Sequence, residues 1–182
     1  MDQINLQVIR ESFGRVVYSH KTHEKEAEIQ QLYASIVKWA NIILITITSG
    51  ALLNTLITDQ RLYLIISTIF ASITLGFVIF QLSFNSEEKA QRHKHIANLL
   101  WSIRERYVSL MADIRNETIS VSQITEQRGV IMRELDLIYK SAPSTSRKAY
   151  QEARKALKVK EEFTFSDEEI NQFLPKDLWF TK

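Results

Sequence analysis

The chain has 182 residues, a formal net charge of +2 and no cysteine. The absence of cysteine excludes disulfides, thiol nucleophiles and thiolate metal sites, and so small a net charge gives no argument for nucleic-acid binding. Glycine and proline are scarce, with four and two residues, which disfavours a turn-rich β fold and favours long helices. The composition therefore predicts an all-α protein.

The first segment, residues 1–38, is predicted to be a helix on the cytoplasmic side. Residues 5–38 contain no proline, and their apolar residues recur at roughly helical spacing. The segment runs directly into the first apolar stretch of the chain, so we expect it to continue one membrane-crossing helix into the cytoplasm.

Two uncharged runs, 39–57 and 62–82, predict a transmembrane helical hairpin over residues 39–86. Each run has about 20 residues, which at ~1.5 Å rise per residue covers the ~30 Å hydrocarbon core of a bilayer. The intervening Asp59, Gln60 and Arg61 permit only a tight reversal, so the two spans are expected to be antiparallel. Lys and Arg gather before the first span and after the second, which predicts that both termini are cytoplasmic.

Small or polar residues recur every fourth position in both spans, and a further amide lies near the end of the second. These residues are Thr46, Gly50 and Asn54, then Thr68, Ser72 and Gly76, and finally Gln81. One interpretation is close helix packing, because small residues let backbones approach each other in lipid. The other is a polar path lined by these residues in an oligomer. No intramembrane charge marks such a path.

The region after the spans, residues 87–182, is predicted to be a cytoplasmic helical region that starts with an arm over 87–118. Apolar residues on this arm alternate by three and four, which is coiled-coil spacing and indicates a partner helix. They are Ile96, Leu100, Ile103, Tyr107, Leu110 and Ile114. The simplest partner is the other arm of the same hairpin, in a stalk that places Glu24, Glu26 and Glu28 level with residues 91–94. We also expect this face to mediate homo-oligomerisation.

Three further helices are predicted at 122–140, 147–160 and 166–174. Ser122 is expected to cap the first, Ser166 opens the third with a capping-box pattern, and Pro175 ends it. The second helix carries most of the basic residues, namely Arg147, Lys148, Arg154, Lys155 and Lys158. They predict a polyanion or partner contact, for acidic lipid or for nucleotide or nucleic-acid phosphates. The alternative is a solvated helix face.

The sequence contains few candidate catalytic or metal-binding residues. In the stalk register, His20 and His23 face the segment that holds His93 and His95, where a metal site or proton sensor is the alternative to ordinary interfacial histidines. Neighbouring carboxylates such as Glu161 and Glu162 point in different directions on a helix. We therefore predict no catalytic residue, no metal site and no cofactor.

The overall arrangement resembles the SLATT family of two-span membrane effectors. The segments that carry the resemblance are Tyr33–Lys38 running into WANIILITI, the arm EEKAQRHKHIANLLWSIRERY and the closing FTFSDEEINQFLPKDL. The closing segment is similar to the branch encoded beside reverse transcriptases.

The resemblance implies an effector of a bacterial anti-phage, abortive-infection system, located in the inner membrane and without enzymatic activity. A companion sensor, such as a reverse transcriptase or nucleotidyltransferase, would supply a nucleotide or nucleic-acid signal. The effector would then oligomerise and permeabilise the membrane. The alternative function is a membrane-tethered scaffold that forms no pore and recruits a cytosolic partner through its helical arms.

Overall fold

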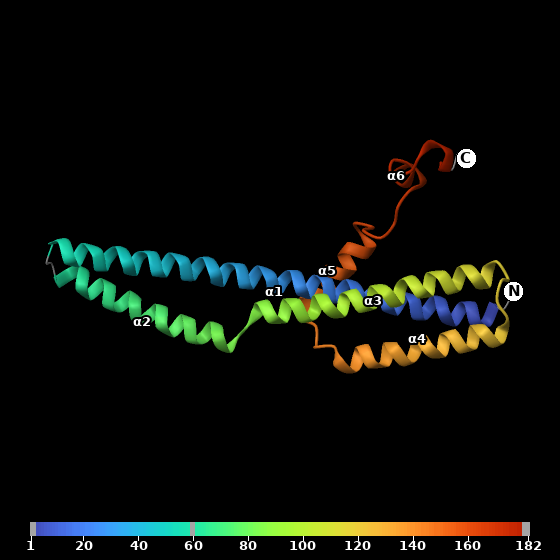
Figure 1. Cartoon of the computed structure of the whole chain (residues 1–182), viewed down its shortest axis with the longest axis horizontal. Coiled ribbons are helices and arrows are strands. Elements are labelled where there is room, and N and C mark those ends of the chain that lie inside the picture. The colour runs from blue at the N-terminus through green and yellow to red at the C-terminus, as the bar shows by residue number, and fades with distance from the viewer. Residues whose placement is uncertain (1–2, 59–60, 180–182) are drawn as a thin grey trace.

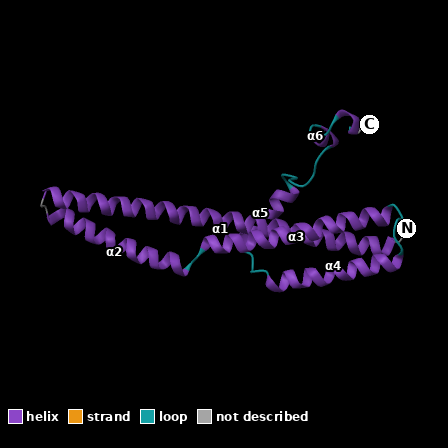
Figure 2. Cartoon of the chain, in the orientation of Figure 1, coloured by secondary structure: helices purple, strands orange, loops and turns teal. Residues whose placement is uncertain are grey.

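The computed structural model describes residues 3–58 and 61–179, and this part of the chain is all-α. It contains six α-helices and one short 3-10 helix, without a strand among the described residues (Figure 2). Asp59 and Gln60 of the predicted reversal lie outside the described residues. The helices form an elongated molecule with a two-helix hairpin at one end and a helical stalk at the other (Figure 1).

The first helix, α1 (Gln3–Thr58), combines the predicted N-terminal segment and the first span in one unbroken element. Gly14 and Gly50 lie within α1 and do not end it. The helix contains no proline, so none of its backbone hydrogen-bond donors is removed. α2 (Arg61–Ser83) returns antiparallel along the second half of α1 (Figure 1). Both helices are long and apolar enough to cross a membrane.

The returning arm is interrupted where α2 meets α3 (Ser86–Arg115). The Asn85 side chain caps α3, because it accepts a hydrogen bond of 3.1 Å from the Glu88 backbone N–H. The negative charges of Glu87 and Glu88 in the first turn interact favourably with the positive end of the helix dipole. α1, on the opposite side, has no such interruption. The stalk and the hairpin are therefore connected by a continuous helix through α1. On the returning side, the connection between α2 and α3 is not helical.

α4 (Val121–Ser141) folds back along α3. Its cap is Ser120, which forms a capping box with Gln123, so the predicted cap at Ser122 was two residues late. The S-x-x-Q spacing from Ser120 is the signal that identifies the correct start. Contacts across the helices hold α4 in place: Arg106 of α3 pairs with Glu134, and Tyr139 donates a 3.0 Å hydrogen bond to Ser19 of α1.

The last elements are α5 (Arg147–Lys158), α6 (Asp167–Asn171) and the 3-10 helix η1 (Lys176–Leu178). α5 packs on α1, whereas α6 and η1 stand away from the stalk (Figure 1). The Ser166–Glu169 capping box at α6 is confirmed. α6 is shorter than the predicted 166–174 and ends before Pro175.

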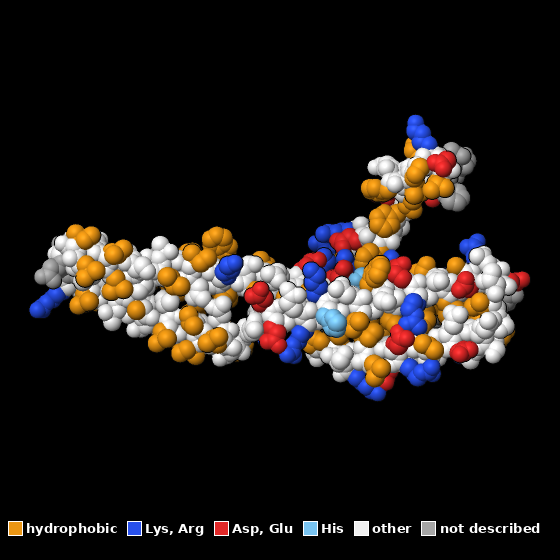
Figure 3. Space-filling model, in the orientation of Figure 1, with side chains coloured by type: hydrophobic (Ala, Val, Ile, Leu, Met, Phe, Trp, Pro, Cys, Tyr) orange, Lys and Arg blue, Asp and Glu red, His pale blue; other side chains and the backbone are white. Residues whose placement is uncertain are grey.

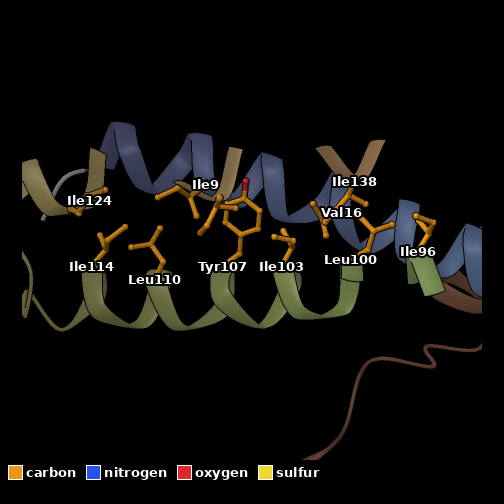
Figure 4. Close-up of a cluster of buried hydrophobic side chains, with 11 residues drawn as sticks. Ile9, Val16, Ile96, Leu100, Ile103, Tyr107, Leu110, Ile114, Ile124 and Ile138 are labelled. Carbon is orange, nitrogen blue, oxygen red and sulfur yellow. The ribbon is translucent and has the colours of Figure 1, made fainter. Parts of the chain in front are cut away.

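The core of the stalk lies between α1, α3 and α4 (Figure 4). All six apolar residues of the predicted heptad face on α3 are buried in it, together with Ile9, Val16, Ile124, Ile131 and Ile138. The predicted stalk packing against α1 is therefore present. The use of the same face for oligomerisation is not compatible with this structure, because α1 and α4 of the same chain already cover it.

The hairpin has the opposite character, since most of its large apolar side chains are exposed. Leu56 is 83 % exposed and Leu82 is 79 % exposed, while Ser67 is the one buried residue of α2. Charged side chains gather over the stalk, a basic side chain lies at the hairpin tip, and the surface between is apolar or uncharged (Figure 3). A surface of this kind requires an apolar solvent, so the hairpin is the membrane part of the fold.

Candidate functional site

The contact between the two spans involves different faces from those predicted. Half-buried side chains recur on both spans at a spacing of three and four. On α1 they include Asn41, Leu44, Thr48 and Ala51, and on α2 they include Phe70, Thr74, Phe77 and Gln81. Of the predicted stripes, only Asn54 is half-buried with these; Thr46, Gly50, Thr68, Ser72 and Gly76 are exposed. The stripes therefore do not pack the two spans of one chain together.

Open space surrounds the stripe glycines, because a Cβ atom at Gly50 or Gly76 would meet no heavy atom within 4 Å. The hydroxyls of the stripes bond to their own helices: Thr46 donates to the Ile42 carbonyl at 2.8 Å, and Ser72 to the Thr68 carbonyl at 2.9 Å. Such bonds satisfy the hydroxyls within each helix. The stripes thus present a smooth surface of small residues outward, toward lipid or another protein.

Gln81 has a specific partner inside the hairpin. The Asn41 amide nitrogen donates to the Gln81 side-chain oxygen at 2.5 Å, and Asn41 Oδ1 is buried without a hydrogen-bond partner among the described residues. The pair lies where the spans meet the stalk. A buried amide pair fixes the register of two apolar helices, because any slip leaves polar groups unpaired in lipid.

A buried polar cluster lies deeper in the stalk, between α1, α3 and α5. It consists of His20, Lys21, Thr22, His23, Glu26 and His93, each no more than 6 % exposed. So many buried polar groups in one place require partners, because each unpaired group would cost on the order of 1–3 kcal/mol. The cluster is the most distinctive feature of the stalk and our candidate functional site.

His23 and His93 form the contact between the two arms. Their Nδ1 atoms lie 3.0 Å apart, so one ring donates and the other accepts. Burial, and next to it the field of His93, lowers the pKa of His23 to about 4. Burial also lowers the pKa of His93, against the opposing effect of Glu26. His95, which the helix turns away from this contact, is exposed.

Glu26 connects the cluster to α5. One carboxylate oxygen accepts from the Ser146 backbone N–H at 2.8 Å, at the cap of α5, and the other accepts from Gln30 at 2.9 Å. Burial opposes ionisation of Glu26, but these hydrogen bonds lower its pKa overall. A carboxylate at the N-terminal end of α5 also interacts favourably with the positive end of the helix dipole.

α5 lies against α1 through three alanines, Ala149, Ala153 and Ala156, each no more than 2 % exposed. Small side chains allow the two helix backbones to approach closely. All five predicted basic residues, Arg147, Lys148, Arg154, Lys155 and Lys158, are exposed on the rest of α5. The structure thus presents them together on one helix.

The segment after α5 is fixed to the cluster as well. Lys21 forms an ion pair of 2.6 Å with Glu162, and the Phe163 ring stacks on His20 with 5.5 Å between centroids. Arg104 of α3 lies over the same ring, 4.5 Å from its centroid. The sequence analysis missed this contact, since a single phenylalanine between polar residues gives no periodic signal.

The acidic residues of the stalk have partners other than those predicted. Glu24 pairs with Lys21 at 2.9 Å and Glu28 with Lys25 at 2.9 Å, both on α1, while Arg92 pairs with Glu88 on α3. A hydrogen bond with His20 contributes most to lowering the pKa of Glu24 to about 2. The two arms do lie at the predicted level, and a cavity of about 300 Å³ between them is lined by Glu24, Ala27, Gln91 and Lys94 among others.

Among the described residues, no group of three or more His, Asp or Glu side chains is placed to hold a metal ion. The cluster instead joins α1, α3, α5 and Phe163 at one level of the stalk. Its geometry fits a mechanical role, in which displacement of α5 or of one arm would be passed to the others.

The family comparison matches residues 6–169 to the SMODS and SLOG-associating 2TM effector domain family 4. The match covers the hairpin, the stalk, α5 and the beginning of α6. No curated protein and no solved structure matches the chain. Because the match extends over most of the sequence, the chain belongs to this SLATT family of two-span effector domains.

Proposed function

We propose that the chain is a membrane effector of a bacterial anti-phage, abortive-infection system. When a companion sensor signals infection, the effector assembles with further copies and permeabilises the inner membrane, without catalysing a reaction. Membership of a family of two-span effector domains supports the effector role. The reverse transcriptase or nucleotidyltransferase as sensor, and a nucleotide or nucleic acid as signal, remain part of the proposal.

The observation that carries this proposal is the continuity of α1. The same helix contributes His23 and Glu26 to the buried cluster and then runs without a break through the first span. A displacement at the cluster therefore rotates or tilts the span directly, whereas the Asn85 break gives α2 freedom to respond. Packing of both arms in one stalk supports the topology with both termini in the cytoplasm.

The outward stripes are the proposed contact between copies and the proposed lining of the path. Their small side chains permit close approach of a second hairpin, and Asn54 supplies an amide with no hydrogen-bond partner for its side chain among the described residues. Gln81 is removed from the predicted lining role because it already pairs with Asn41.

The test is membrane potential and growth of bacteria that express the chain with its genomic neighbour, before and after phage challenge. We expect depolarisation with the natural spans and a loss of depolarisation for Asn54→Leu combined with Gly50→Leu and Gly76→Leu. Leu53→Ala, at an exposed apolar position of the same span, is the matched control and should depolarise normally.

A scaffold without a pore is the second candidate function, and the exposed basic face of α5 favours it. In this case the protein would recruit an anionic partner to the membrane. Replacement of both spans by Leu/Ala helices distinguishes the two functions, because the scaffold would keep its protective effect and the effector would lose it. Unchanged membrane potential during phage challenge would reject the effector proposal.

A further inference from the structure

The C-terminal arm, residues 164–179 with α6 and η1, carries large apolar side chains that are exposed to solvent. Phe165 is 62 % exposed and Phe173 is 83 % exposed, and Leu178 and Trp179 are exposed as well. The arm stands away from the stalk (Figures 1 and 3). Unlike the apolar surface of the hairpin, it projects near the basic helix, on the stalk and away from the membrane part. Clustered apolar side chains on a short exposed segment indicate a docking peptide.

The charge of the arm complements the charge of α5. The arm carries four acidic residues and one basic residue, with Asp167, Glu168 and Glu169 in the first turn of α6. α5 carries five basic residues and one acidic residue, and its surface also exposes Tyr150 and the adjacent Val159. An acidic helix with apolar side chains therefore matches a basic helix with apolar side chains, both exposed in the single chain.

In this structure the arm does not cover the α5 of its own chain, whose basic residues are all exposed (Figure 1). α5 turns its alanines toward α1, so its basic residues lie on the sides away from α1. Phe163 is held against His20 of α1 and Arg104 of α3. Only two residues separate Phe163 from the cap at Ser166, a reach of about 10 Å over three chain steps, so the start of α6 stays near Phe163.

We propose that the arm of one copy docks on the basic surface of α5 in a second copy. The proposal deepens the assembly step of the proposed function and rests on it. The contact is heterologous, since each copy contributes its arm on one side and its α5 on the other. Repetition of such a contact gives a ring where the rotation between copies closes, and a ring suits assembly of hairpins around a common axis. It also replaces the buried α3 face as the cytoplasmic contact between copies.

Crosslinking tests this contact directly, because the chain has no native cysteine. Two differently tagged copies, one with Phe173→Cys and one with Tyr150→Cys, would be co-expressed, purified together in detergent and treated with a short bismaleimide. We expect a crosslinked product that contains both tags. Leu137→Cys, at an exposed position of α4, replaces Tyr150→Cys in the matched control and should give little product.

Charge reversal then tests the electrostatic match. Arg154→Glu with Lys155→Glu on the α5 copy should abolish most of the product, and Asp167→Lys with Glu168→Lys on the arm copy should restore it. Crosslinking only when both cysteines are in one chain would overturn the proposal in favour of an intramolecular contact. A product that is absent, or that charge reversal leaves unchanged, would also overturn it and leave a companion protein as the occupant of the arm.

Crosslinking and membrane potential are separate readouts, so failure of the docking contact can be told apart from failure of the effector function. Depolarisation that persists in cells whose variants no longer crosslink would reject this docking contact and leave the effector function intact. A crosslinked product in cells that never depolarise would support the contact and reject the permeabilising function.

Discussion

His23 and His93 face each other across the stalk with 3.0 Å between their Nδ1 atoms, buried between α1 and α3. A contact at this distance requires a proton on one nitrogen and a lone pair on the other. If both rings were charged, two N–H groups would point at each other and the arms would have to separate. The neutral pair is therefore part of what keeps the arms together.

Acidification should destabilise the stalk between about pH 6.5 and pH 4. The pKa of His23 is lowered from 6.5 to about 4, so the unfolded chain binds more protons than the folded chain in this window. Stability is then complete above pH 6.5 and falls as the pH decreases, by on the order of 2 kcal/mol at about 1.4 kcal/mol per pKa unit after allowance for partial solvent screening. Thermal unfolding of the purified chain in detergent, followed by tryptophan fluorescence, measures the change.

The lowered pKa values of Glu24 and Glu26 give a second loss of stability, but only below about pH 4.5. The range from pH 6.5 to 4.5 therefore isolates the histidines. His23→Asn keeps a polar group near Nδ1 without titrating there, so its stability should fall less over this range than that of the natural chain, and the remaining dependence comes from His93, whose pKa is also lowered by burial. His95→Asn, at the exposed histidine of α3, should retain the natural pH dependence. Equal slopes for His23→Asn and the natural chain would contradict this explanation.

Leu100→Ala should cost about 2–5 kcal/mol of stalk stability, because Leu100 is fully buried and its loss leaves a cavity. The neighbouring Leu99 is 36 % exposed, so Leu99→Ala should cost far less and provides a control of identical chemistry. Denaturant unfolding in detergent compares the two variants. Similar losses for both would indicate that a second copy covers the Leu99 side of α3.

The docking of α5 depends on its three buried alanines. Ala153→Leu places a larger side chain between α5 and α1 and should detach α5, whereas Gln151→Leu on the exposed side should leave it in place. Detachment is measured by limited trypsin cleavage after Arg154, Lys155 and Lys158, which should become several-fold faster. Unchanged cleavage of Ala153→Leu would show that the Glu26 cap and Phe163 hold α5 without the alanines.

Strong periodic signals made much of the fold predictable from the sequence. The heptad face of α3 is buried as a unit, and the register of the two arms brings His23 close to His93. Both follow from the strict spacing of apolar residues in a helix that is surrounded by water. Where water surrounds a helix, the apolar face must point inward, so the sequence identifies the face as well as the helix.

The orientation of the spans could not be deduced in the same way. In lipid both faces of a helix are apolar, so the stripe with Gly50 and Gly76 carries no information on which side meets the other span. The contact of α5 was also hidden, because alanines at helical spacing indicate only a good helix former. The third helix of the core explains the misplaced oligomer face: the heptad pattern shows that Leu100 needs a partner, but not that α4 of the same chain provides it.

The pair of Asn41 and Gln81 should behave as a coupled unit in a double-mutant cycle. Either Asn41→Leu or Gln81→Leu leaves one amide unpaired inside the hairpin, while the double variant removes both and replaces them with apolar contact. We expect a coupling energy of about 0.6 kcal/mol and no more than about 1.7 kcal/mol, the mean and the maximum of such cycles for side-chain hydrogen bonds between membrane helices. Unfolding of the hairpin in mixed micelles, with a fluorophore on each arm, provides the measurement. Additive losses would show that each amide bonds to water at the membrane boundary and that the register depends on Phe70, Thr74 and Phe77 instead.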